Sequence, residues 1–257
     1  MKLHRSVAFV PLVCLASAFS ALSAQAAVSI YLSPNGVESA ETSGITGVTT
    51  ETFSIGTGYK DSISSSLGSY SGSGFVIEEN IYGGYQEGNY LGIQTGQAMT
   101  LSLTTGAAYF GFYFSAGDAG NVVELYSQGN LLLTFKTADL IAMLPNTDGT
   151  TIQAINGSLY NTKDYWGQPG PNQGTTSNEP YAYVHFVGTN GTTFDQIRFS
   201  EPTTATFETD NHSVRTTAPT LPGTLVDITG TVQVPEPSGA ALGLFSLGAL
   251  ALFRRRA

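Results

Sequence analysis

Acidic side chains are the first residues in this sequence that could do chemistry. Asp118 lies in a Gly-Asp-Ala-Gly-Asn segment, and Glu208 and Asp210 lie close to Asn211. Carboxylate and carbonyl oxygens are the ligands of Ca²⁺, which takes roughly six to eight of them. Asp and Asn also form turns through their own side chains, and the sequence has no D-x-D-x-D-G calcium loop. Turn formation with no cofactor is therefore the simpler interpretation, and a calcium site made by Asp118, Glu208 and Asp210 stays open as the alternative.

Two adjacent carboxylates and two histidines are the next candidates. On a strand, Glu78 and Glu79 would point to opposite faces, so they could not form the facing pair that glycoside hydrolysis needs. His185 shares one face of a predicted strand with two tyrosines, which favours a packed or rim position, and His212 follows Asn211. No G-x-S-x-G elbow, H-E-x-x-H pair or glycine-rich phosphate loop occurs. We therefore predict a protein that is not an enzyme.

Aromatic side chains in polar surroundings give a binding hypothesis. Tyr82 and Tyr85 lie in a glycine-rich segment, and Tyr165 and Trp166 stand before a long loop rich in proline and glycine. Flat aromatic faces with neutral polar neighbours suit sugar rings, and jelly rolls often serve as lectins. Tyrosine is equally a good residue for packing strands and loops. Polysaccharide binding through these four residues and simple packing are both consistent with the sequence.

The charge balance limits the partners of the protein. Of 257 residues, 10 are basic and 19 acidic, and 11% are charged, less than half of the usual share of roughly 25%. Between positions 27 and 234 there are five basic residues and eighteen acidic ones, a formal net charge of −13. Anionic polymers are therefore poor partners, and we predict no nucleic-acid partner.

The N-terminal residues read as an export signal. Two basic residues precede the apolar run 7–22, and small residues follow, ending in Ala24 and Ala26 of an A-x-A motif. This order of parts is that of a secretory signal peptide. We expect residues 1–26 to engage the Sec translocon and signal peptidase to cleave after Ala26. Because the single cysteine lies at position 14, the exported protein would have no thiol and no disulfide.

The C-terminus has a second composite signal. Three parts follow one another: Pro235, Glu236 and Pro237, the uncharged segment 238–253, and Arg254, Arg255 and Arg256. Sixteen uncharged residues make a marginal membrane span, because a helix needs roughly 17–25. The arginines would hold their end in the cytoplasm by the positive-inside rule. A plain membrane anchor is one interpretation of this tail.

The order and position of these parts resemble the PEP-CTERM sorting signal, over about the last 23 residues. The resemblance implies that exosortase, a membrane cysteine peptidase-like transpeptidase, recognises Pro-Glu-Pro and removes the helix. The prolines keep Glu236 extended, as a peptidase cleft requires. The resemblance also implies a bacterium with an outer membrane and an exopolysaccharide matrix. The protein would be anchored transiently in the inner membrane and would then reach the cell surface or the matrix.

The body between the two signals has the periodicity of strands. We predict strands at 48–55, 74–77, 99–104, 109–114, 121–126, 131–136, 181–187, 194–199, 204–208 and 225–234. One short helix is predicted at 138–144, with Thr137 as its N-cap. Short strands separated by Gly, Asn and Ser turns indicate an all-β fold, a single jelly-roll-like β-sandwich over residues 27–217. A signal helix and a hydrophobic helix would flank it, and residues 218–234 would be a final strand or stalk.

Three segments of the body, 107–113, 116–121 and 207–212, are similar to ectodomain segments of exosortase-dependent surface proteins. This second resemblance implies a strand-end Phe-Glu-x-Asp-Asn that closes the sandwich, and it names no activity. The sequence thus predicts an exported surface or matrix protein with a structural or adhesive role and possible partners among extracellular polysaccharides. The alternative is a carbohydrate-active enzyme or a calcium-dependent lectin that carries the same tail.

Overall fold

The computed structural model describes residues 27–79, 88–115, 117–167, 178–203 and 205–222. The predicted signal peptide with Ala24 and Ala26, the predicted strand 225–234 and the whole sorting tail lie outside the described residues. Tyr82 and Tyr85 also lie outside them. The first described residue, Ala27, opens the first strand.

The described residues form mostly strands. They are β1 (Ala27–Leu32), β2 (Thr49–Glu51), β3 (Gly58–Ser64), β4 (Gly68–Ile77), β5 (Tyr90–Gln94), β6 (Gln97–Ala107), β7 (Tyr109–Phe114), β8 (Val122–Ser127), β9 (Asn130–Lys136), β10 (Thr151–Gln153), β11 (Leu159–Asn161), β12 (Ala182–Thr189), β13 (Phe194–Glu201) and β14 (Thr206–Arg215). One α-helix, α1 (Thr137–Met143), and one 3-10 helix, η1 (Thr162–Tyr165), complete the set. The all-β prediction is confirmed.

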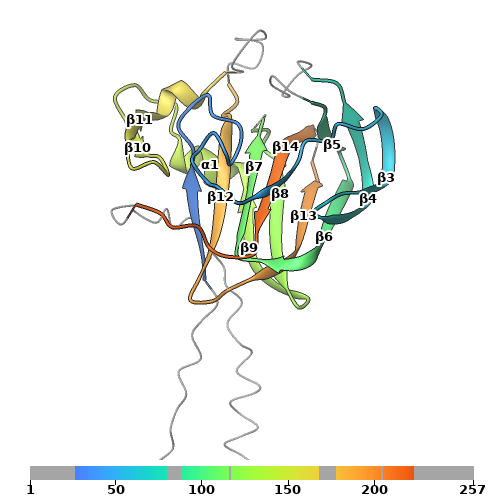
Figure 1. Cartoon of the computed structure of the whole chain (residues 1–257). Coiled ribbons are helices and arrows are strands. Elements are labelled where there is room, and N and C mark those ends of the chain that lie inside the picture. Colours follow the sequence, from blue (N-terminus) through green and yellow to red (C-terminus); the bar gives the residue numbers. More distant parts are fainter. Residues whose placement is uncertain (1–26, 80–87, 116, 168–177, 204, 223–257) are drawn as a thin grey trace, which may run out of the picture.

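Twelve strands form one antiparallel sheet in the order β1-β12-β7-β14-β5-β4-β6-β13-β8-β9, with β2 beside β14 and β3 beside β4. The sheet curls around the core until β9 lies near β1, so it is nearly closed (Figure 1). Strands β10 and β11 form a separate hairpin. We expected a jelly-roll-like sandwich of two sheets, whereas the described residues have one large curled sheet, because hydrogen bonding is not interrupted between the two sides of the core.

Strand β4 carries the sheet from one side of the core to the other. Its first half, Gly68–Gly72, pairs with β6, and its second half, Phe75–Ile77, pairs with β5. Gly72 ends the first half with a φ of +138°. A Cβ atom at this position would overlap the carbonyl oxygen of Ala98 in β6. Only glycine satisfies both the left-handed backbone and the close approach of the two strands.

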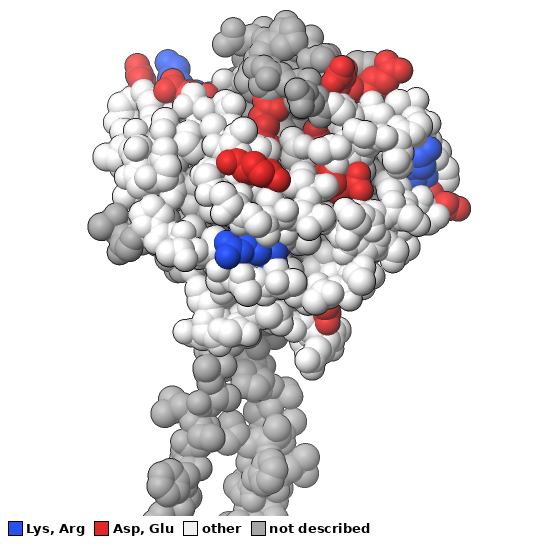
Figure 2. Space-filling view, viewed as in Figure 1, with Lys and Arg blue, Asp and Glu red and all other residues white. Residues whose placement is uncertain are grey.

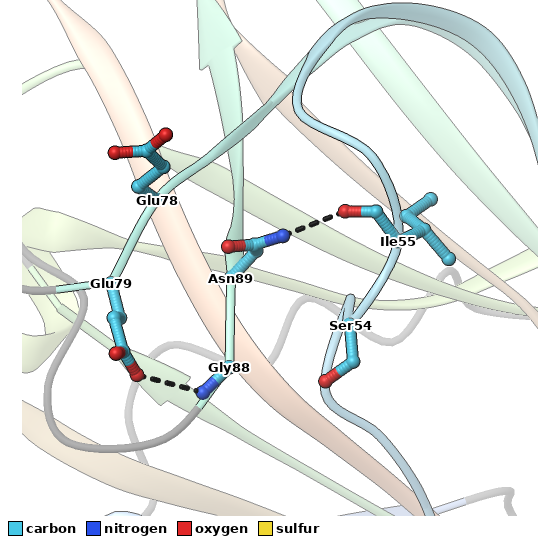
Figure 3. A pocket seen from close by; sticks show the side chains of 6 residues that line it. All are labelled: Ser54, Ile55, Glu78, Glu79, Gly88 and Asn89. Carbon is cyan, nitrogen blue, oxygen red and sulfur yellow. Dashed lines mark hydrogen bonds between the residues drawn. The ribbon is translucent and has the colours of Figure 1, made fainter.

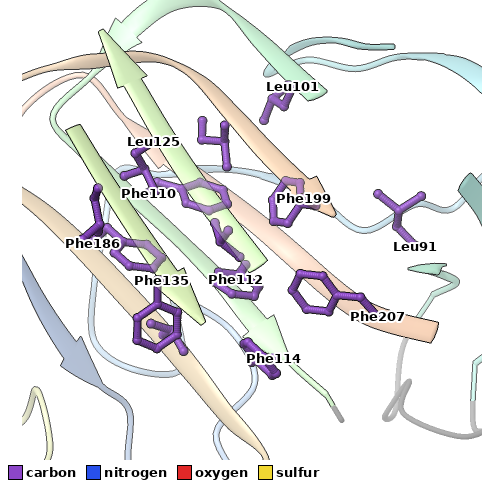
Figure 4. Close-up of a cluster of buried hydrophobic side chains, with 14 of the residues drawn as sticks. Leu91, Leu101, Phe110, Phe112, Phe114, Leu125, Phe135, Phe186, Phe199 and Phe207 are labelled. Atoms are coloured by element: carbon purple, nitrogen blue, oxygen red, sulfur yellow. The ribbon is translucent and has the colours of Figure 1, made fainter. Parts of the chain in front are cut away.

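Phenylalanine rings fill the interior (Figure 4). Phe110 and Phe112 of β7 are fully buried and lie nearly parallel to Phe186 of β12, with interplanar angles of 4° and 7°. Phe199 of β13 meets the same two rings edge-on. Such aromatic pairs contribute about 0.5–1.5 kcal/mol beyond the area they bury. Because no cysteine follows position 14, this packing carries the stability of the body.

The outer face of β7 is also buried. Tyr109 and Tyr113 lie there in a second apolar cluster with Tyr183 of β12. The segment between β1 and β2 covers this cluster through Ala40 and Ile45. The prediction that the strand 109–114 places phenylalanines on one side and tyrosines on the other, with both faces buried, is confirmed.

Most of the other local predictions also hold. The predicted strands 99–104, 121–126, 131–136, 181–187 and 194–199 correspond to β6, β8, β9, β12 and β13. The predicted turns between them contain left-handed residues, Gln128 with Gly129 and Asn190 with Gly191, as hairpin turns require. The predicted strand 48–55 is reduced to β2, and the predicted strand 204–208 runs on to Arg215.

The predicted cap of the helix is wrong by one residue. Thr137 is the first residue of α1, and Lys136 precedes the helix as its N-cap. The Lys136 N–H donates to a carboxylate oxygen of Asp139 at 2.8 Å, and the Thr137 hydroxyl donates to the carbonyl oxygen of Asp118. The threonine therefore ties the helix to the β7–β8 connection instead of capping it.

The start of β1 and the end of β14 lie at the same end of the sheet. Ala27 pairs with Thr189 in β12, and Arg215 pairs with Tyr109 in β7. Tyr109 in turn pairs with Val187, two residues before Thr189. Segments leading to the N-terminus and to the C-terminus thus start within a few strands of each other.

Candidate functional site

A pocket opens beside the connection between β4 and β5. Its volume is about 620 Å³, within the usual range for small-molecule sites, and it is lined by Ser54, Ile55, Glu78, Glu79, Gly88 and Asn89. Figure 3 shows these side chains from close by. Three chain segments build the pocket: the connection between β2 and β3, the residues after β4 and the residues before β5.

Both glutamates line this pocket, and Figure 3 shows their carboxylates pointing in opposite directions. We expected Glu78 and Glu79 to point to opposite faces of a strand, but β4 ends at Ile77. Without strand geometry the alternation of side chains does not apply, and both residues line the pocket. The two carboxylates thus diverge although neither residue belongs to a strand, and they do not face each other across the pocket in Figure 3.

Hydrogen bonds inside the pocket use one N–H of the Asn89 amide and the N–H of Gly88. The Asn89 side-chain NH₂ donates to the Ile55 carbonyl oxygen at 2.6 Å, and the Gly88 N–H donates to Glu79 Oε2 at 3.1 Å. Both bonds are drawn in Figure 3, where the Asn89 oxygen points away from Ile55. The Ser54 hydroxyl shares a hydrogen bond with Thr52 Oγ1 at 3.0 Å.

Two of the four aromatic residues predicted to contact sugar, Tyr165 and Trp166, lie among the described residues, and both pack against the body. Tyr165 is 2% exposed, and its hydroxyl donates to the Ser33 carbonyl oxygen at 2.7 Å. Its ring therefore has no open face for a sugar. Trp166 is half-buried against the core, and its indole N–H donates to the Leu144 carbonyl oxygen at 2.8 Å. Both residues pack the C-terminal end of η1 onto the body.

Tyr82 and Tyr85 remain predictions, because they lie outside the described residues. In the sequence they fall between Glu79 and Gly88, two residues that line the pocket. Sequence reasoning did not find Ser54, Ile55 or Asn89. No local pattern marks these residues, because the pocket forms only when their three segments come together.

The structure places Asp118 and Glu208 in one acidic neighbourhood. Burial raises the pKa of Glu208 to about 8, and the carboxylates of Asp118, Glu179 and Glu201 act in the same direction. Burial also raises the pKa of Asp118, with a further contribution from Glu201. Glu201 is fully buried, and one of its oxygens accepts hydrogen bonds from the backbone and the hydroxyl of Thr203 at 2.5 and 2.6 Å.

Asp210 lies in a different neighbourhood. Burial raises the pKa of Asp210 well above its usual range, and the charge of Glu51 adds to this. Burial, and then the charge of Asp210, raises the pKa of Glu38 to about 9. In the part of the chain that the structure describes, no three Asp, Glu, His or Cys side chains are arranged to hold a metal ion. The calcium alternative for Asp118, Glu208 and Asp210 therefore gains no support.

Both histidines are buried and bonded through both ring nitrogens. His185 bonds to the Tyr109 hydroxyl and the Ser33 hydroxyl, each at 2.8 Å. His212 bonds to the Tyr70 hydroxyl at 3.0 Å and the Thr209 hydroxyl at 2.8 Å. Burial lowers the pKa of each histidine to about 3. His185, expected in a packed or rim position, is packed.

Few charges are paired on the surface. Acidic atoms predominate over basic ones on the face seen in Figure 2. Within the described ranges one ion pair is found, between Arg198 and Glu124 at 2.7 Å. None of the helices in these ranges is long and apolar enough to cross a membrane, and the predicted span 238–253 lies outside them.

Residues 233–257 match the family model of the PEP-CTERM protein-sorting motif. No curated protein and no solved structure matches the chain. The chain therefore carries a PEP-CTERM sorting motif at its C-terminal end, and the sorting resemblance is confirmed. This motif implies an exported protein with exosortase as its processing partner.

Proposed function

We propose that the exported body is a non-catalytic structural or adhesive component of the cell surface or extracellular matrix. In this proposal it binds matrix polysaccharide at the pocket formed by Ser54, Ile55, Glu78, Glu79, Gly88 and Asn89. The observation that carries the proposal is this polar, open pocket on a body whose tail addresses it to exosortase. Carboxylate, amide and hydroxyl groups are the groups that bind sugar hydroxyls in water.

The position of the chain ends supports display of this pocket. Ala27 begins β1, and β4 and β5 lie on the opposite side of the body in Figure 1. A body held through its N- or C-terminal segment would therefore keep the pocket away from the point of attachment. The proposed signal peptide and cleavage after Ala26 would leave β1 at the start of the mature chain.

The state of the histidines supports a role without catalysis. A general base must reach the proton it removes and must titrate near the working pH. His185 and His212 are both fully buried, and burial lowers the pKa of each to about 3. Their ring nitrogens are used in hydrogen bonds that hold strands together.

One observation favours a second function, glycoside hydrolysis. Glu78 and Glu79 open to the same pocket, and a pair of carboxylates is what most glycosidases use. The same sample tests both functions, because hydrolysis releases new reducing ends whereas adhesion does not.

The experiment uses the full chain expressed in a bacterium that makes exosortase and exopolysaccharide, and in the same strain without exosortase. We expect the product of the first strain to start at Ala27, to end near Pro235 to Pro237, and to co-sediment with the exopolysaccharide. A product that keeps Arg254 to Ala257 in both strains would make the tail a plain anchor. Correct processing with no retention by the polysaccharide would reject the adhesive role, and release of reducing ends would establish the enzyme.

A further inference from the structure

We infer that the polysaccharide bound at this pocket carries free amino groups, so that the unit it accepts is a protonated amino sugar. This inference rests on the proposed polysaccharide binding and adds the class of sugar. It follows from which hydrogen-bonding groups and charges the pocket leaves available.

Most of the available groups are acceptors. One hydrogen of the Asn89 NH₂ group and the N–H of Gly88 are used by the Ile55 carbonyl oxygen and by Glu79. What remains are three acceptors, the carboxylate of Glu78, the second oxygen of Glu79 and the side-chain oxygen of Asn89, and one donor, the second hydrogen of the Asn89 NH₂ group. Within the described ranges no hydrogen bond to the Glu78 carboxylate is found. A ligand that donates hydrogen bonds therefore fits this pocket better than one that accepts them.

The available charge is negative. Two carboxylates line the pocket, and the described lining includes no Lys or Arg. Lys60, the nearest basic residue in the sequence, directs its ammonium group to the Thr57 carbonyl oxygen at 3.5 Å. An anionic sugar would be repelled, and a neutral sugar would leave both carboxylates without a counter-charge. An ammonium group offers three donors and a positive charge, and charge-assisted hydrogen bonds are about twice as strong as neutral ones.

The size and the apolar part of the pocket favour a sugar over a bare cation. A volume of about 620 Å³ is far larger than one ion needs. Ile55 is 38% exposed at the rim, and its side chain offers an apolar contact for the CH face of a sugar ring. The body as a whole attracts polycations, because its formal net charge is −13 between residues 27 and 234 and long-range attraction raises the local concentration of an oppositely charged polymer.

The test measures binding of the processed protein, produced from the full chain, to oligosaccharides that share one backbone. The probes are fully deacetylated glucosamine oligomers, the matching N-acetylated oligomers and, as a basic peptide, polylysine. The variant E78Q/E79Q removes two charges from the pocket and keeps the shape of both side chains. The variant D61N/D164N removes two charges from exposed positions outside the pocket and is the matched control.

We expect the deacetylated oligomers to bind at least about tenfold more tightly than the acetylated ones, with affinity falling as salt rises. The E78Q/E79Q variant should lose about tenfold or more of this affinity, since one charge-assisted hydrogen bond contributes roughly that factor. The D61N/D164N variant should bind like the unaltered protein, and each variant should melt as the unaltered protein does.

Several results would overturn the inference. One is equal affinity for the deacetylated and the acetylated oligomers. A second is unchanged binding of the deacetylated oligomers by the E78Q/E79Q variant. A third is polylysine that binds as tightly as the deacetylated oligomers and loses as much affinity in E78Q/E79Q. Binding that disappears with a chelator would replace the amine contact by a bridging cation. If the protein still binds the native exopolysaccharide in these cases, the proposed function stands and only the sugar class fails. If it binds no polysaccharide, the proposed function fails as well.

Discussion

The imidazole of His212 in β14 lies flat against the phenyl ring of Phe199 in β13, with ring centroids 4.6 Å apart and planes inclined by 17°. These strands are not neighbours in the sheet, so the pair forms a contact across the core. Phe53 meets the same imidazole edge-on at 5.0 Å. A polar ring thus occupies an aromatic interior, and hydroxyl groups of Tyr70 and Thr209 satisfy its two nitrogens.

Replacing this ring should destabilise the body strongly. The substitution His212→Ala would leave a cavity among aromatic rings and two buried hydroxyl groups without their partner. We expect a loss of about 3–5 kcal/mol in the free energy of unfolding, by analogy with large-to-small substitutions in cores. Urea denaturation measures the loss. Tyr59→Ala, at a ring that is 55% exposed, is the control and should cost less than about 1 kcal/mol; a similar loss in both variants would contradict this account of His212.

The buried titratable groups should give the protein a stability maximum in mildly acidic solution. Burial lowers the pKa of His185 and His212 to about 3, below their ordinary value of about 6.5. The unfolded chain then binds more protons between these values, so both groups destabilise the fold as pH falls through this window. Glu208 and Glu38 act in the opposite sense, because burial raises their pKa to about 8 and about 9.

These two carboxylic acids stabilise the fold below their unfolded pKa near 4.5, and that contribution is lost as pH rises toward 8 or 9. The opposing slopes overlap between about 4.5 and 6.5, where we expect the maximum. Outside this window each group contributes a slope of up to about 1.4 kcal/mol per pH unit. Melting temperatures measured from about pH 3 to about pH 9, the range that these pKa values span, test this expectation. In Glu208→Gln the alkaline decline should be shallower, and an unchanged decline would show that Glu208 does not titrate as inferred.

Gly72 should tolerate no side chain. Its φ is +138°, and a Cβ atom would overlap the Ala98 carbonyl oxygen in β6. We expect Gly72→Ala to cost about 2 kcal/mol or more, from backbone strain and from the separation of β4 from β6. Gly56→Ala is the matched control, since Gly56 has open space around it and no left-handed φ. Comparable melting temperatures for the two variants would mean that the backbone of β4 at position 72 can shift to accept a side chain.

The sorting tail should depend on its prolines. In Pro235→Ala/Pro237→Ala, Glu236 loses the constraint that keeps it extended, and we expect a product that retains Arg254, Arg255 and Arg256 in the membrane fraction. Intact mass and cell fractionation report this. The same double change at Pro219 and Pro222 is the control and should leave processing intact. Normal processing of the first variant would show that exosortase does not require the prolines here.

Several features of this protein follow from the sequence alone, because they depend on residues that are close together in the chain. The order Pro-Glu-Pro, apolar segment and arginines identifies the sorting motif without any fold. The apolar run 109–114 predicts a strand buried on both faces, since no polar side chain is available to face water. Turns such as Asn190-Gly191 follow from residue types that accept a positive φ.

The pattern of neighbouring residues was not sufficient to predict a strand that is exposed at a sheet edge, or a side chain that is buried by distant segments of the chain. Most of β3 is polar and exposed, so no alternation marks it, and its pairing with β4 defines it as a strand. In the sequence Tyr165 stands before a long loop and His212 follows Asn211, yet contacts with Ser33 and Tyr70, more than a hundred residues away, bury them.

Tertiary structure alone decided which acids share a site. Glu78 and Glu79 line one pocket because β4 ends before them, and Asp118 joins Glu208 because β7 and β14 are adjacent in the sheet. Asp210, two residues from Glu208, faces Glu38 and Glu51 instead. The physical reason is that the register and curl of a sheet set distances between side chains that the spacing along the chain does not encode.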